Sequence, residues 1–325
     1  MNLNLYDKDL NRISAIGVNF VSCLWSEGYN VAQDFTLELR AVPEYKEKVK
    51  PDCYVGRTDR KTLMVIKSVQ SVDNRIIAAG KQATRVLDDV AFIGTIPENS
   101  VIDTFVKSAY NSSSKFYNLE FADTNLGVRY DSQISHKSFL GLCETMCQES
   151  DLGFRVIRDN GGLLAEFYRP ELSTNTKLAE KFGNVRIESL ILSTENEKNY
   201  AIVLGGGEEE NRVRVDVDMT GGEDRREVIV DARDLQQEEN ETIASYQARL
   251  KARGIETLLS CQKTWECSFF PLAEEFGKKY DLGDVVLVIL SDYGIKLEAR
   301  ITRFTQKEQL NQTETTLEVG SITIR

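Results

Sequence analysis

The chain contains a single histidine, and any catalytic relay that moves a proton through imidazole must use it. His136 lies directly before a segment with helical periodicity, and no nucleophile pattern accompanies it. Ser-His-Asp and Cys-His enzymes need a hydroxyl or thiol whose proton the imidazole can remove. We therefore expect a surface or capping role for His136, and we expect no catalytic residue in this chain.

Six cysteines are spread along the 325 residues without a short-spaced framework: Cys23, Cys53, Cys143, Cys147, Cys261 and Cys267. Clustered cysteines are typical of small secreted disulfide scaffolds, so we expect these thiols to be reduced and mostly buried. Cys143 and Cys147 face one side of a predicted helix. A zinc site would need two more ligands at a recognisable spacing, and none is near. Core packing is the preferred interpretation, and no metal or cofactor is expected.

Negative charge is concentrated in the segment 205–241, which holds thirteen acids and five arginines. The triglycine at 205–207 could begin a phosphate loop, but the acids Glu208, Glu209 and Glu210 follow it and no Gly-Lys-Ser/Thr ending does. Three carboxylates would repel phosphate, so a turn is predicted.

Acids that alternate along predicted strands could in principle form a two-metal nuclease site. They are Asp216, Asp218, Glu227, Asp231 and Asp234. Such alternation is more often a solvated strand face, which is the preferred interpretation. Paired carboxylates for glycoside cleavage stay open, because their separation is a three-dimensional quantity. No motif indicates them.

Composition places the chain among ordinary soluble globular proteins, with 41% hydrophobic and 28% charged residues. The net charge of −11 argues against nucleic-acid binding, which depends on clustered Lys and Arg. The start, residues 1–8, has neither the basic residues nor the apolar core of a signal peptide, so we expect the protein to begin in a cytoplasm. The longest apolar run has the length of a strand, so no membrane span is expected.

The stretch from Tyr280 to Phe304 reads as a β-hairpin. An apolar run at 285–290 leads to a turn at 291–294, and apolar residues then alternate with polar ones from 295 to 302. The first arm should be covered on both faces, whereas the second should keep one face wet. A closed or nearly closed β-structure is therefore predicted.

The spacing of hydrophobic residues divides the chain into three parts. Residues 1–93 read as short strands of a small barrel, 94–183 as an inserted α+β domain, and 184–325 as a second β domain with a helical insertion near 242–261. In the middle domain Ser100 is expected to cap a helix, and a hairpin turn is predicted at 159–162. Gly254 is a weak point in the last helix, costing about 1 kcal/mol.

A faint internal repeat supports two related β domains. Tyr54-Val55-Gly56 before the strand at 64–69 resembles Asp281-Leu282-Gly283 before the strand at 299–304. Each glycine marks a strand entry.

Four segments resemble the siphovirus ReqiPepy-type tail protein family. Its "R-x-E-x-x-V-D-A-R-D" signature is similar to residues 225–234, and its "N-x-A-I-V-x-G-x-G" strand to residues 199–207. Leu126-Gly127-Val128-Arg129 matches its "L-G-x-R" segment, and residues 280–286 its "Y-x-L-G-D-x-V". At Tyr168-Arg169-Pro170 the chain departs from an Asp-Arg pair found in relatives, which puts the role of that loop in doubt.

The resemblance implies a mainly β fold with inserted α+β structure and two small β-barrels per chain, of the tail-hub type. It implies a structural phage tail or baseplate hub protein, a homotrimer that joins the sixfold tail tube to the threefold tip and forms part of the DNA channel. Its expected partners are the tail tube or distal tail protein, the tip, spike or fibre protein, and the tape measure protein. DNA would be met only in transit, and no membrane would be bound. Localisation would be the virion tail, after assembly in the host bacterial cytoplasm.

Two other classes of function remain as alternatives. One is a tail-associated enzyme that degrades the cell wall, or a nuclease that uses the acidic strands. The other is a carbohydrate-binding module at the tail tip, which would need exposed aromatic side chains, for which Phe116, Tyr117 and Tyr168 are the candidates.

Overall fold

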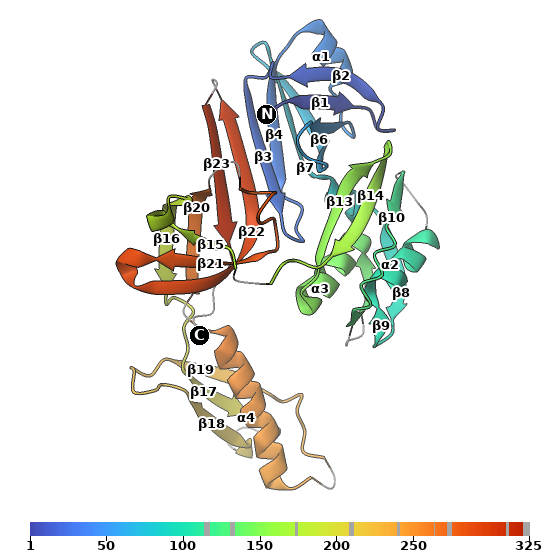
Figure 1. Ribbon diagram of the computed structural model, residues 1–325. Coiled ribbons are helices and arrows are strands. Elements are labelled where there is room, and N and C mark those ends of the chain that lie inside the picture. The colour runs from blue at the N-terminus through green and yellow to red at the C-terminus, as the bar shows by residue number, and fades with distance from the viewer. Residues whose placement is uncertain are drawn as a thin grey trace. The chain divides into compact units, whose positions relative to one another are not determined.

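The computed structural model describes residues 1–113, 118–130, 134–172, 175–207, 211–238, 241–262, 264–271, 275–309 and 312–320. The chain forms two compact units, one from residues 1–189 with 267–324 and the other from residues 190–266 (Figure 1). Strands far outnumber helices in the described residues, which confirms the mainly β fold expected from the sequence. No helix in that part of the chain has the length and apolar character of a membrane span.

The N-terminal part of the first unit is a set of strands with one short helix. Its elements are β1 (Leu3–Tyr6), β2 (Arg12–Gly17), β3 (Ser22–Gly28), β4 (Asp34–Arg40), α1 (Pro43–Lys48), β5 (Tyr54–Arg57), β6 (Leu63–Val72), β7 (Arg75–Gln82) and the 3₁₀ turn η1 (Ala83–Asp89). Alternation sets the buried face: in β4, Phe35, Leu37 and Leu39 are buried and the residues between them are not.

The C-terminal part of the chain supplies a second set of strands. Its elements are β15 (Lys177–Ala179), the turn η2 (Glu180–Phe182), β16 (Val185–Ser193), β20 (Thr264–Pro271), β21 (Val285–Leu290), the turn η4 (Ser291–Tyr293), β22 (Ile295–Gln309) and β23 (Gln312–Val319). Near the C-terminus, β23 pairs with both β20 and β22.

The two sets of strands form one sheet, because β22 pairs with β3. The pairing is antiparallel and runs from Arg303 opposite Gly28 to Gln309 opposite Ser22. The strand order is β16-β20-β23-β22-β3-β4-β7-β6-β5-β1-β2, with β21 pairing β22 and β15. In Figure 1, β3 and β22 accordingly lie side by side. Among the described strands no pairing closes either half, so two closed barrels stay a proposal.

The predicted hairpin is present as β21 and β22, with a turn at Ser291–Tyr293 followed by Gly294 at φ +65°. The second arm alternates as expected. The first arm differs from expectation: Val286, Val288 and Leu290 are buried, but the intervening residues are only half-buried. Cover is therefore complete on one face of β21 and partial on the other.

The middle part of the first unit is an α+β structure. Its elements are β8 (Ala91–Ile96), β9 (Ser100–Val101), α2 (Ile102–Asn111), β10 (Leu119–Phe121), β11 (Arg129–Tyr130), β12 (Ile134–Ser138), α3 (Phe139–Ser150), β13 (Gly153–Asp159) and β14 (Gly162–Tyr168). The β13–β14 hairpin turns through Asn160 and Gly161, both at positive φ, as the sequence predicted. Helices α2 and α3 share a core in which the rings of Tyr110 and Phe139 meet edge to face, with centroids 5.3 Å apart.

The prediction that Ser100 caps the helix that follows it was wrong. Helix α2 begins after Val101, whose side chain makes no capping hydrogen bond. Ser100 lies in β9, and its hydroxyl donates to the carbonyl of Pro97. Ser100 therefore pairs with β11 and does not cap the helix, although the helical pattern of the sequence alone predicted a cap.

The second unit packs one helix on a three-stranded sheet, ordered β18-β17-β19. Its elements are β17 (Tyr200–Leu204), β18 (Arg214–Asp218), β19 (Glu227–Asp231) and α4 (Ile243–Ser260). Helix α4 lies along these strands (Figure 1), and its residues Tyr246, Leu250 and Leu258 share a buried core with Ala201 and Val203 of β17. The helix predicted near 242–261 is present as α4.

Candidate functional site

The histidine and cysteines have no catalytic surroundings in the described residues. His136 is exposed in β12, at positive φ beside a register shift in the pairing with β8. Cys143 and Cys147 are buried in the core of the middle part, and burial raises the pKa of the Cys143 thiol well above its usual value. Four of the described cysteines are buried, Cys261 is half-buried, and all five are free thiols. The side chain of Cys267 lies outside the described residues.

Asp216 and Asp231 alternate with buried valines that face α4, so these two acids lie on the opposite face of the sheet, where arginines bind them. Asp216 is on β18 and Asp231 on β19, with β17 between them. The guanidinium of Arg214 lies 2.7 Å from Asp216, and that of Arg212 lies 2.6 Å from Asp231. No three His, Cys, Asp or Glu side chains of the described chain gather as a metal site requires. The structure does not bring the candidate nuclease acids together.

The triglycine packs against α4. The amide of Gly206 donates to the Tyr246 hydroxyl at 2.7 Å, and the amide of Gly205 donates to the carbonyl of Val213. A Cβ atom on Gly205 would approach the same Tyr246 hydroxyl to 2.5 Å, so close packing accounts for this glycine. Glu208, Glu209 and Glu210 lie outside the described residues, as do Phe116 and Tyr117.

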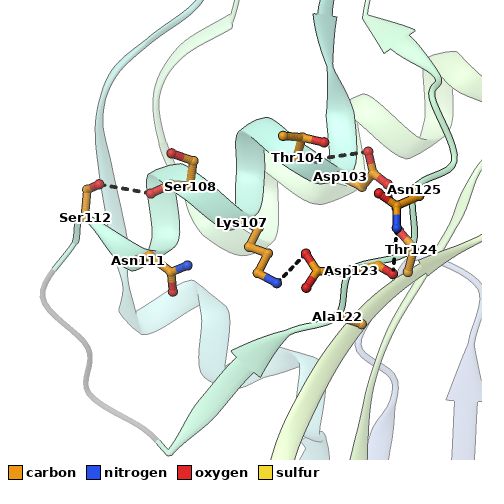
Figure 2. Close-up of a pocket in the computed structure, with 10 residues that line it drawn as sticks. All are labelled: Asp103, Thr104, Lys107, Ser108, Asn111, Ser112, Ala122, Asp123, Thr124 and Asn125. Carbon is orange, nitrogen blue, oxygen red and sulfur yellow. Dashed lines mark hydrogen bonds and ion pairs between the residues drawn. The ribbon is translucent and has the colours of Figure 1, made fainter.

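Helix α2 forms one wall of a polar pocket of about 430 Å³, which Figure 2 shows. The opposite wall is the segment 122–125. Every lining side chain except that of Ala122 is polar. Lys107 of α2 and Asp123 of the facing segment are ion-paired at 2.5 Å. The two walls of the pocket are thus fixed to each other.

Asp103 anchors the far wall of this pocket. Its buried carboxylate accepts hydrogen bonds from the Thr124 hydroxyl and the Leu126 amide, both at 2.9 Å, and from the Thr104 amide. Burial alone would raise the pKa of Asp103, but these hydrogen bonds outweigh it and hold the pKa below its usual value. Asp103 is therefore ionised at neutral pH and orders the segment after β10.

A larger cleft, of about 710 Å³, lies inside the first unit and is lined by residues from all three of its parts. Its centre is Arg60, whose guanidinium stacks near the rings of Phe276 and Phe304, 4.8 and 4.6 Å from their centroids. The Nε atom of Arg60 is 3.2 Å from Glu27, whose residue is 3% exposed. Glu27 also accepts from the Trp25 indole and the Thr62 hydroxyl, so its carboxylate is fully engaged.

Two further arginines of the cleft are also paired. Arg57 donates to Asp59 through two nitrogens, and this hydrogen bonding lowers the pKa of Asp59. Arg155 lies over the ring of Tyr168 and pairs with Glu166; burial opposes a raised pKa of Arg155, but Glu166 raises it. Arg57 also donates to Gln306 at 2.6 Å and so joins β5 to β22, whereas the contacts of Arg155 stay within the β13–β14 hairpin. The role of these arginines is to hold the cleft together, and Tyr168 belongs to this network.

Comparison with known proteins identifies the family. A model of the family described as siphovirus ReqiPepy6 Gp37-like protein matches residues 2–321. The chain belongs to this family. No curated protein matches the Gp37-like sequence.

Several solved structures share the Gp37-like fold. The prophage MuSo2 43 kDa tail protein from Shewanella oneidensis is 14% identical, with a TM-score of 0.61 and coverage of 98% of each chain. The prophage tail protein gp18 from Listeria monocytogenes EGD-e is 15% identical, with a TM-score of 0.57, covering 98% of this chain and 94% of its own. A chain of the phage P2 baseplate in its activated conformation is 10% identical, with a TM-score of 0.50 and 98% coverage of each chain. The fold is therefore that of phage tail and baseplate proteins.

The segments that resemble the Gp37-like family have structural roles here. Asp231 accepts from Arg212 and Arg233, Ala232 is fully buried, and Asp234 pairs with Arg253 of α4. This signature thus fastens the end of β19 to the helix above it. The loop whose sequence departs from the family is also tied down, because Arg169 donates to the carbonyl of Leu126.

Sequence analysis missed the Arg60 cleft. Glu27 was a usable signal, because it is the one charged residue of strand β3, between Trp25 and Gly28. A buried acid needs a nearby cation. Which cation it would be depends on the β3–β22 pairing, which has no local sequence signature.

Proposed function

We propose that this chain is a structural hub protein of a phage tail: a homotrimer that joins the sixfold tail tube to the threefold tip and surrounds the DNA channel. The observation that carries the proposal is the full-length likeness in fold to phage tail proteins. In this chain two β halves are joined through the pairing of β3 with β22. Two similar barrels per chain would give three chains six barrels in a ring. The proposed domains are 1–93, 94–183 and 184–325.

The outermost strands of the large sheet support contacts between copies. β2 and β16 each have one neighbour among the described strands, so each offers a free edge. β16 also carries Ile191 and Leu192, which are 51% and 50% exposed. A head-to-tail contact between unlike edges closes into a ring when the rotation permits. The remaining proposed neighbours are the tail tube or distal tail protein, the tape measure protein, and a tip, spike or fibre protein.

The proposal is tested by native mass spectrometry and light scattering at micromolar concentration. We expect a species of three times the 36.8 kDa of one chain. Low-resolution imaging of tails that carry a tagged copy should place the tag at the tip end of the tube. A stable dimer, or a tag found along the tube, would contradict the proposal.

We also propose that the acidic segment 205–241 faces the DNA path, where a negative wall would keep phosphates from sticking. All five of its arginines are ion-paired, which supports the alternative of a solvated face for the paired acids. Replacing Glu208, Glu209 and Glu210 with lysine separates the two. Slower genome ejection from intact particles supports the lumen, and normal ejection refutes it.

We propose that the chain is not itself a hydrolase. The network around Arg155 supports this, because Glu166 is bound by a guanidinium at 2.6 Å. Zymograms with peptidoglycan and plasmid-cleavage assays with Mg²⁺ or Mn²⁺ should show no activity. Clearing or nicking that is lost on Glu166→Gln or Asp231→Asn would contradict the proposal.

A further inference from the structure

The polar pocket beside α2 has no part in the proposed hub function, and its chemistry selects a ligand class. We propose that this pocket binds a neutral saccharide, of one or two pyranose rings, through hydrogen bonds to Thr104 and Ser108 of α2 and to the facing segment 122–125. Figure 2 shows these side chains around the hollow.

The charges of the pocket exclude a charged ligand. Lys107 is its one lining cation among the described residues, and Asp123 neutralises it at 2.5 Å. The carboxylate of Asp103 is buried and already accepts from three donors. An anion would therefore find no free cation, and a cation would find no free carboxylate. Among the described residues Ala122 is the one apolar side chain of the lining, which favours a polar ligand over an apolar one.

Hydroxyl groups remain available to a ligand. The side chains of Thr104 and Ser108 are exposed, and neither hydroxyl makes a hydrogen bond within the described residues. Each can both donate and accept, as sugar hydroxyls do. They are four residues apart on α2, so they lie one above the other on the same face of the helix. Successive hydroxyls of one sugar ring could be bound there together.

The pocket is also preorganised and of suitable size. Its volume of about 430 Å³ falls in the usual range for small-ligand sites, roughly 300–1,000 Å³. Asp103 and the Lys107–Asp123 pair fix the facing segment before any ligand arrives, so little ordering is needed on binding. No aromatic ring lines the pocket in the described part of the chain. The contacts that the described lining residues offer to a ligand are mainly hydrogen bonds, and we expect Kd values on the order of 1 mM.

Saturation-transfer difference NMR on the full chain tests this inference. The probes are methyl α-D-glucoside, methyl α-D-galactoside, N-acetylglucosamine and N,N′-diacetylchitobiose, with N-acetylneuraminic acid as the charged comparison. We expect saturable signals from at least one neutral probe. Ser108→Trp should fill the pocket and abolish them, and the double variant Thr104→Ala/Ser108→Ala should weaken binding at least about tenfold by removing both hydroxyls.

The matched control is Ser135→Trp, which adds the same ring to an exposed serine of β12 outside the pocket and should leave binding unchanged. Far-UV circular dichroism of each variant verifies the fold. Silence from all four neutral probes, signals that survive Ser108→Trp, or binding of the charged sugar alone would each overturn the inference. None of these outcomes bears on the trimer, which is measured separately by mass.

Discussion

The guanidinium of Arg60 lies 3.2 Å from the buried carboxylate of Glu27 and lies near the rings of Phe276 and Phe304. Those two rings are stacked, with centroids 4.6 Å apart and planes 10° from parallel. Glu27 belongs to β3, Phe304 to β22, and Phe276 to the segment before β21. The Arg60 guanidinium therefore contacts segments from both ends of the chain, one through an ion pair and the other through two aromatic rings.

Glu27→Ala should lower the free energy of unfolding by about 3 kcal/mol, because it leaves the Arg60 guanidinium with Asp281 alone, at 3.8 Å, and removes the acceptor of the buried Trp25 and Thr62 donors. Urea unfolding followed by far-UV circular dichroism measures the change. Lys48→Ala is the control, since it breaks an exposed pair with Glu44 and should cost less than about 1 kcal/mol. Equal effects from the two substitutions would show that Glu27 is not a structural anchor.

Gly283→Ala should destabilise the meeting point of the three parts of the first unit. Gly283 has φ +91°, and a Cβ atom there would lie 2.4 Å from the ring of Tyr29. The Tyr29 hydroxyl donates to the carbonyl of Leu152 and accepts from Arg300, so this ring has little freedom to move. We expect a loss of about 1–2 kcal/mol from the left-handed backbone and about 1–3 kcal/mol more from the clash.

The matched control is Gly294→Ala, at φ +65° in the turn after β21, where a Cβ atom would meet nothing within 4 Å. Only the backbone cost should appear there. If both alanine variants lose the same stability, the contact with Tyr29 contributes nothing.

Local patterns predicted the hairpins and helices, because their signals lie within a few residues. The turn at Asn160-Gly161 and the alternation in β22 are of this kind. The pairing of Gln306 with Trp25 joins residues far apart in sequence, and neither residue carries a mark of the other. At Ser100 a local signal was misleading. The sequence predicted a helix cap, but Ser100 pairs with Tyr130 of β11, which the local sequence does not indicate.

The acid stability of the middle part should depend on Asp103. Hydrogen bonds depress the pKa of this carboxyl in the folded chain, so its contribution is present above the unfolded pKa, about 3.9, and is lost as pH falls through the folded value. The Tm difference between wild type and Asp103→Asn should be large at pH 7 and should shrink as the pH falls below the unfolded pKa. Asp292→Asn removes an exposed carboxyl in η4 and should leave the Tm unchanged both at pH 7 and at the lower pH. A pH-independent effect of Asp103→Asn would refute the assignment.

Thiol reactivity should follow burial. Burial raises the pKa of Cys23 to about 12, and those of Cys143 and Cys147 also rise, so few thiolates exist at these sites at pH 8. Mass mapping after iodoacetamide treatment of native protein should find Cys261 modified before these three. EDTA should change neither the order nor the circular dichroism spectrum. Early labelling of Cys143 would contradict the buried core.

Gly254→Ala should destabilise the second unit, although helix propensity alone favours alanine by about 1 kcal/mol. The sequence marked Gly254 as a weak point of its helix. In the structure it is buried where α4 crosses the sheet, and a Cβ atom would lie 2.7 Å from the Cγ2 atoms of both Val203 and Val217. The crowding should cost about 1–3 kcal/mol, which exceeds the propensity gain.

The control for this glycine makes the same substitution where the space is ordinary. At Gly141 in α3 the nearest atom to a new Cβ is the Ser138 hydroxyl oxygen at 3.4 Å, so Gly141→Ala should be neutral or stabilising. Urea unfolding of both variants gives the comparison, and adding Val203→Ala to Gly254→Ala should recover part of the loss by making room. If Gly254→Ala is more stable than wild type, α4 can shift away from β17. Gly254 would then not be needed for the close packing of this helix on the sheet.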